Sequence, residues 1–158
     1  MKSRIPFIFL LFLTLQFTAP AAAEDSPWHR IGNDGHLVVK LWFFWSESCP
    51  HCQDARPVIE KMARQNKWLQ VESRELISSR KNRELFDQMG KQFSREARSV
   101  PTFFFCNTMM VGFESEQTTG RFILQRLNEC RTALAAGNPL PVPQQPGTTT
   151  LRQATGIN

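Results

Sequence analysis

Two cysteines separated by two residues are the part of this chain best suited to chemistry. Cys49, Pro50, His51 and Cys52 form a C-x-x-C pair directly after the apolar run 37–45. A helical pattern follows the pair, and strand, turn and helix in this order are the setting in which two such thiols act as a redox couple. The sequence therefore predicts a redox centre, with Cys49 as the attacking thiol and Cys52 as its partner.

The start of the helix is expected to make Cys49 reactive. We expect Cys49 at the N-cap and Pro50 at the first helical position, which proline tolerates. The sulfur would then accept hydrogen bonds from the backbone N–H groups of His51 and Cys52, at the positive end of the helix dipole. The helix end and His51 both favour the thiolate, which is the nucleophile. Because stabilising the thiolate stabilises the reduced form, it also makes the disulfide a stronger oxidant.

The N-terminal residues are typical of an export signal. Lys2 and Arg4 precede the apolar run 5–15, and alanines at 21–23 suit cleavage. We therefore expect a signal peptide over 1–23 and an exported protein, periplasmic if its source is a Gram-negative bacterium. An uncleaved membrane anchor is the alternative, although the apolar run is short for a span.

The charge balance argues against nucleic acid as a partner. The whole chain has 19 Lys and Arg residues against 14 Asp and Glu, a formal net charge of +5. Lys2 and Arg4 would leave with the signal, and the remaining excess is too small to indicate nucleic-acid or membrane binding. The basic residues over 80–98 alternate with acidic ones, which is typical of a solvated helix face.

The rest of the pattern predicts one α/β domain over 24–136. The run 37–45 is apolar enough for a strand covered on both faces. The predicted order of elements, β-α-β-α-β-β-α, fits a sheet with helices on both faces. Further strands are predicted at 68–76, 101–105 and 111–113, with a turn at 107–110, and helices at 50–66, from 80, and from 118 or 119 to 137.

Single residues are expected to shape the helices and the C-terminus. Pro57 lies inside the first helix and should kink it, and Gly90 is expected to break the second. The Pro-rich residues 137–158 are predicted to be a disordered tail. The last helix should bury an apolar side made of Phe122, Ile123, Leu127, Cys130 and Leu134.

Three further motifs accompany the cysteine pair. They are Pro57, eight residues after Cys49, V-P-T at 100–102 before three phenylalanines, and V-G-F at 111–113 before the last helix. With them, roughly residues 37–135 resemble the thioredoxin superfamily, in particular its exported DsbA-like and thioredoxin-like disulfide oxidoreductases. The resemblance implies a thioredoxin-like fold, in which helices flank a central mixed sheet.

The resemblance also implies an activity and a substrate loop. Val100, Pro101 and Thr102 would form a loop with a cis peptide bond before Pro101, beside Cys49 and Cys52. The protein would exchange disulfides with protein substrates that have cysteines, without a cofactor or a metal. A membrane or soluble redox partner would recycle the pair. The direction of electron flow, as oxidase, isomerase or reductase, stays open.

The chain departs from the family pattern at two points. Phe43 stands six residues before Cys49, where family members often have a buried carboxylate that assists proton transfer at the second cysteine. Glu47 or water would have to serve instead, or the step would be slower. The stretch from Cys52 to Pro101 is also too short for the helical insertion of DsbA-like proteins, so the body is closer to a thioredoxin.

Other functions and pairings are open from the sequence. Cys106 and Cys130 are expected to form a structural disulfide, and the alternatives are two buried free thiols or a second redox pair. Cys49, His51 and Cys52 are also ligand types that suit a soft metal such as copper or zinc, although their spacing is poor for structural zinc. A redox-inert adaptor and a partner-specific reductase in the envelope are further alternatives.

Overall fold

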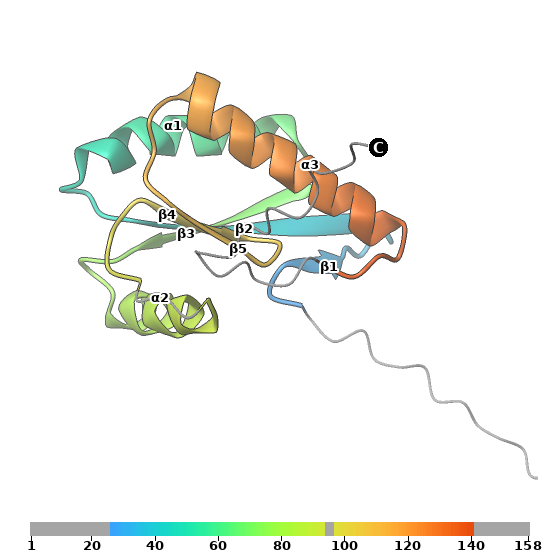
Figure 1. Ribbon diagram of the computed structural model, residues 1–158, viewed down its shortest axis with the longest axis horizontal. Helices are drawn as coiled ribbons and strands as arrows, with labels where there is room; N and C mark the ends of the chain where they lie inside the picture. The colour runs from blue at the N-terminus through green and yellow to red at the C-terminus, as the bar shows by residue number, and fades with distance from the viewer. Residues whose placement is uncertain (1–25, 94–96, 141–158) are drawn as a thin grey trace, which may run out of the picture.

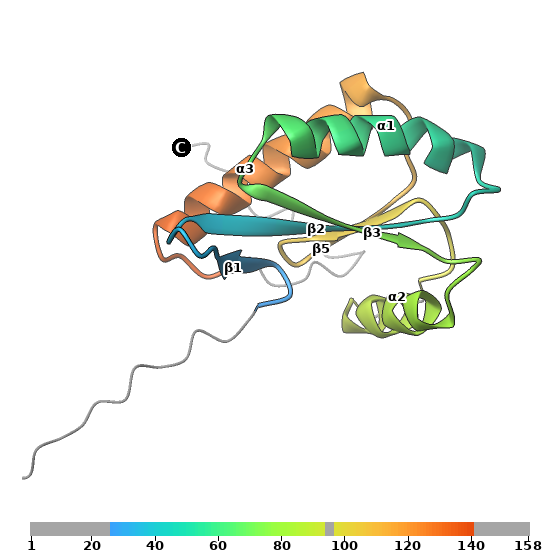
Figure 2. The same cartoon turned by 180° about the vertical axis from the view of Figure 1, so that it is seen from behind.

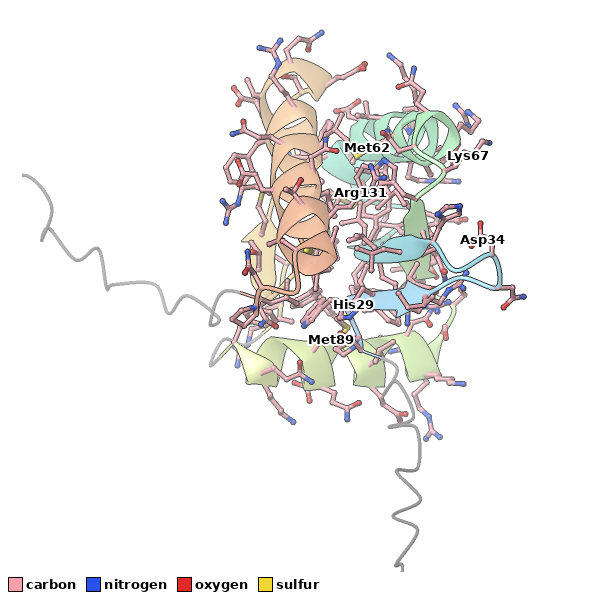
Figure 3. All side chains as sticks on the ribbon, turned by 90° about the vertical axis from the view of Figure 1, so that its right-hand side faces the viewer. His29, Asp34, Met62, Lys67, Met89 and Arg131 are labelled. Carbon is pink, nitrogen blue, oxygen red and sulfur yellow. A yellow bond between two sulfur atoms is a disulfide. The ribbon has the colours of Figure 1, made fainter. Side chains whose placement is uncertain are left out.

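The fold is α/β, with helices on both faces of a sheet. The computed structural model describes residues 26–93 and 97–140, so the predicted signal peptide at 1–23 lies outside them. In the described part, helices α1 (Pro50–Gln65) and α3 (Arg121–Ala135) cover one face, and α2 (Arg80–Gln92) covers the other (Figure 1). Figure 3 shows these layers from the end of the sheet. No helix among these residues is long and apolar enough to cross a membrane.

Strand β2 (Leu37–Trp45) is the centre of the sheet. It pairs in parallel with β3 (Leu69–Glu75) on one side and antiparallel with β1 (His29–Ile31) and β4 (Thr102–Phe105) on the other. Strand β5 (Thr108–Val111) adds to β4, again antiparallel. The bounds predicted for the central strand are confirmed at both ends. Strand β1 was not predicted, because its three residues are too few to establish an alternating pattern.

Two separate cores lie on the two faces of the sheet. Successive side chains of β2 point to opposite faces, so this strand contributes to both cores. Phe43 belongs to the core under α1 and α3, and Phe44 to the core over α2. The α2 core is mostly aromatic: Trp28, Phe44, Phe86, Met89, Phe93 and Phe104.

Helix α2 begins where predicted but is not broken at Gly90. Ser79 caps it, and the Ser79 hydroxyl accepts a hydrogen bond from the backbone N–H of Asn82 at 3.2 Å. Gly90 is buried inside the helix, which continues to Gln92. Glycine costs only about 1 kcal/mol in a helix interior, and the packing of this apolar side outweighs that cost.

The β4–β5 hairpin turns earlier than predicted. Cys106 and Asn107 form the turn, with φ angles of 48° and 57°. Two consecutive residues with positive φ give a tight turn whose twist matches that of the strands. The prediction of a turn at 107–110 and a strand at 111–113 was wrong, because a cysteine was not expected in the left-handed region. Val111 is instead the last residue of β5.

The last helix is preceded by a wider π-helical turn. This turn, η1 (Glu116–Gly120), is capped by Ser115 and closed by a hydrogen bond from the Gly120 N–H to the Ser115 carbonyl at 3.0 Å. The helical segment therefore starts before the predicted residues 118 and 119. Phe122 is exposed rather than buried as predicted, because the buried stripe of α3 runs through Ile123, Leu127 and Cys130 and leaves its neighbour outside.

A disulfide bond joins the C-terminal half of α3 to the sheet. Cys106 and Cys130 form a disulfide that joins the β4–β5 turn to α3, so the prediction of a structural disulfide is confirmed. The helix ends before Gly137, as predicted, where φ is 71°. Leu140 packs against both cores, so the fold extends past the predicted boundary at 136. Residues 141–158 of the predicted tail lie outside the described part.

The disulfide is expected to contribute measurably to stability. A variant with Cys106→Ser and Cys130→Ser should lose about 3 kcal/mol of unfolding free energy in the chain-entropy model, given a separation of 24 residues. Urea unfolding of the variant and the parent protein measures the loss. A difference below about 0.5 kcal/mol would show that the bond does not restrain the unfolded chain as the model assumes.

Candidate active site

The cysteine pair lies where β2 passes into α1. Cys49 is the N-cap of α1, and Pro50 occupies the first position of the helix. The Cys49 sulfur accepts a hydrogen bond from the backbone N–H of Cys52 at 3.3 Å. The second donor that was predicted, the N–H of His51, is not among its partners in the described part. The Cys49 N–H donates to the Ser46 carbonyl at 3.2 Å, which closes the loop before the helix.

The two thiols differ in accessibility and acidity. Both are free, Cys49 is half-buried, and Cys52 is fully buried. Burial, followed by the hydrogen bond with Cys49, raises the pKa of the Cys52 thiol to about 12, and a backbone hydrogen bond with Ser46 opposes this shift only in part. Cys52 is therefore protonated at neutral pH, and Cys49 is the sulfur that a reactant meets first.

A second loop lies directly against Cys49. The peptide bond between Val100 and Pro101 is cis, which is the isomer predicted for this loop. The Cys49 thiol donates to the Val100 carbonyl at 3.5 Å. Pro101 and Thr102 are buried, and the Pro101 carbonyl accepts a hydrogen bond from the Gly112 N–H at 2.8 Å. The structure thus brings together the two predicted parts of the site, which are about 50 residues apart in the sequence.

Phe43 belongs to an aromatic stack that ends at the surface. Its ring packs in parallel on Phe103, with centroids 5.1 Å apart, and on Trp45, with centroids 6.5 Å apart. The guanidinium of Arg56 covers the Trp45 ring at 4.1 Å. The ring of Phe43 therefore lies in an aromatic stack, where related proteins often have a buried carboxylate for proton transfer. Glu47, the residue expected to serve instead, is exposed.

Glu75 is a residue of the site region that sequence reasoning missed. Its carboxylate accepts hydrogen bonds from the backbone N–H groups of Ile77 and Ser78, both at 2.7 Å, and from the Ser78 hydroxyl at 2.6 Å. These bonds, those of Ser78 first, and a further one from the Glu47 backbone lower the pKa of Glu75. Glu75 thereby holds the start of the β3–α2 loop, directly beside Trp45 at the end of β2. An acidic residue three positions before the Ser78-Ser79 pair was the available signal.

The metal alternative requires further ligands near the pair. Over residues 26–93 and 97–140, no three His, Cys, Asp or Glu side chains lie close enough together to hold a metal ion. His51 is exposed on the first turn of α1.

The different burial of the two thiols predicts an order of alkylation. Brief treatment of the reduced native protein with iodoacetamide at pH 7 should modify Cys49 and spare Cys52, because Cys52 is both buried and protonated. Peptide mass spectrometry measures the label at each site. Denaturation before labelling is the control and should modify both thiols. Equal labelling of the two in the native protein would contradict the geometry.

Comparison with known proteins identifies no family for this chain. No protein-family model matches it, and no curated protein gives a significant match.

Proposed function

We propose that the protein is an exported thiol–disulfide oxidoreductase of the thioredoxin-like kind, which exchanges disulfides with protein cysteines. The observation that carries the proposal is the position of the Cys49 sulfur. It lies at the N-terminus of a helix, 3.3 Å from the Cys52 N–H and 3.5 Å from the carbonyl before cis Pro101. A half-buried thiol at a helix N-terminus, beside the backbone of a neighbouring loop, is suited to attack on another sulfur.

The arrangement of the strands supports the thioredoxin-like part of the proposal. In the order β3, β2, β4, β5, the first pair is parallel and the other two are antiparallel. Helix α1 connects the parallel pair and begins at the cysteines. Helices on both faces, and a cis proline directly before β4, are features that the resemblance implies, and they support this part of the proposal.

The proposed reaction is a two-electron exchange in two steps. The Cys49 thiolate attacks a client disulfide, forms a mixed disulfide and releases one client thiolate. Cys52 then attacks the Cys49 sulfur, so that the Cys49–Cys52 disulfide forms and the second client sulfur leaves as a thiol with the proton from Cys52. The client disulfide is reduced and the protein is oxidised. The same steps in reverse oxidise a client dithiol, and a redox partner restores the starting state.

Serine variants of the two cysteines test this cycle. Cys49→Ser should abolish exchange, because the accessible nucleophile is lost. Cys52→Ser should accumulate mixed disulfides with disulfide-containing proteins, because Cys49 still attacks the client disulfide but the resolving sulfur is lost. Non-reducing gels and mass spectrometry of the trapped adducts measure both effects. Adducts that form equally well with Cys49→Ser would exclude Cys49 as the attacking sulfur, and wild-type protein without any exchange would exclude the function.

The redox potential tests the role of His51 and the direction of electron flow. Equilibration with glutathione gives the potential of the Cys49–Cys52 couple, to be compared with about −270 mV for thioredoxin and about −120 mV for DsbA. His51→Ala should make the potential more negative by roughly 30 mV, a tenfold change in the equilibrium constant, because a group that favours the thiolate is removed. An unchanged potential would show that exposed His51 does not tune the pair.

A further inference from the structure

The loop between β3 and α2 exposes a large apolar side chain. Ile77 is 66% exposed, the highest fraction among the large apolar side chains of the described residues. A single exposed apolar residue needs no explanation by itself. What distinguishes Ile77 is that its backbone is fixed and that its loop adjoins the cysteine pair.

Hydrogen bonds from side chains hold the backbone of this loop on both sides of Ile77. The Glu75 carboxylate accepts the Ile77 N–H at 2.7 Å. Arg83 donates through Nη1 to the carbonyls of Leu76, at 2.6 Å, and of Ile77, at 2.8 Å. Asn82 donates to the Glu75 carbonyl at 2.7 Å. The loop is thus ordered before anything binds, which removes most of the ordering cost that a flexible loop would add to binding.

The same loop is joined to the loop that carries Cys49. Trp45 and Glu75, the last residues of β2 and β3, are paired in the sheet, and the Leu76 N–H donates to the Trp45 carbonyl at 3.0 Å. Figures 1 and 2 show both loops at one end of the sheet, where α1 begins.

We propose that Ile77 is a docking contact for the client, and that it favours extended polypeptide segments with an apolar side chain next to the reacting cysteine. The inference rests on the proposed function and names a substrate preference for it. Leu76, directly before Ile77, packs against the α2 core, and the polar residues Ser78, Ser79 and Arg80 follow Ile77. This setting fits one apolar side chain of a segment already engaged at Cys49, rather than a broad apolar surface.

The test measures attack by Cys49 alone, so that it does not depend on the direction of electron flow. In the full chain with Cys52→Ser, Cys49 attacks the peptide sulfur of a peptide–thionitrobenzoate disulfide. A peptide–Cys49 disulfide forms and the coloured thionitrobenzoate leaves, which gives a second-order rate constant. Two peptides that differ only in having Leu or Ser beside the cysteine are compared with the small dithiobis(nitrobenzoate) disulfide.

Ile77→Ser should slow the reaction with the Leu peptide by about fivefold to tenfold, the effect of one apolar contact of roughly average size. The rates with the Ser peptide and with the small disulfide should stay unchanged. Ile77→Thr, which keeps the branched shape, should give an intermediate loss. Ile31→Ser is the matched control, because Ile31 is 56% exposed beside the turn that contains Asp34, at the opposite end of the sheet (Figure 3). This control should leave all three rates unchanged.

Each alternative outcome overturns a defined proposal. If the small disulfide reacts but Ile77→Ser leaves the Leu peptide unaffected, the docking contact is wrong and the exchange function stands. The docking contact is equally wrong if Ile77→Ser slows all three substrates to the same extent, or if Ile31→Ser has the same effect on the Leu peptide. If Cys49 reacts with none of the three substrates, the exchange function is wrong, and the docking contact that rests on it is wrong too.

Discussion

The burial of β2 on both faces is the constraint on which the rest of this structure depends. Its side chains alternate between a core under α1 and α3 and a core over α2, so the strand cannot shift along its axis without exposing one set or the other. Because Cys49 follows the strand after a short loop, the fixed register also fixes the start of α1. The position of the reactive sulfur is therefore set by packing along the whole strand, more than by the few residues around it.

Strong local patterns made part of this structure predictable. The strand 37–45 was correct at both ends, and helix α1 to within one residue, because an unbroken apolar run and a proline after a capping residue leave few alternatives. The errors occurred where backbone geometry departed from residue preference. Cys106 adopts positive φ and shortens a turn, and a π-helical turn begins the last helical segment earlier than predicted. No periodicity in the sequence encodes either departure.

The parts of the site that sequence reasoning could not supply are contacts between loops. The C-x-x-C pair and the V-P-T motif were recognisable singly, and the strand pairing of β2 with β4 places them side by side. The role of Glu75 depends on two loops meeting after the parallel strands β2 and β3, and a single sequence does not reveal which loops meet. A carboxylate that satisfies several backbone N–H groups resembles an ordinary charged surface residue until those partners are known.

The two pairs of sulfur atoms place opposite demands on the maturation of this chain. Cys106 and Cys130 are held in one buried bond, whereas Cys49 and Cys52 are free thiols in the same molecule. A newly made chain must therefore receive an oxidising equivalent for one pair without being locked in a wrong pairing through Cys49, its most accessible thiol. Four cysteines allow three pairings, and only one of them joins Cys106 to Cys130 and leaves Cys49 with Cys52. A protein proposed to exchange disulfides with other proteins thus itself depends on disulfide formation during its own folding.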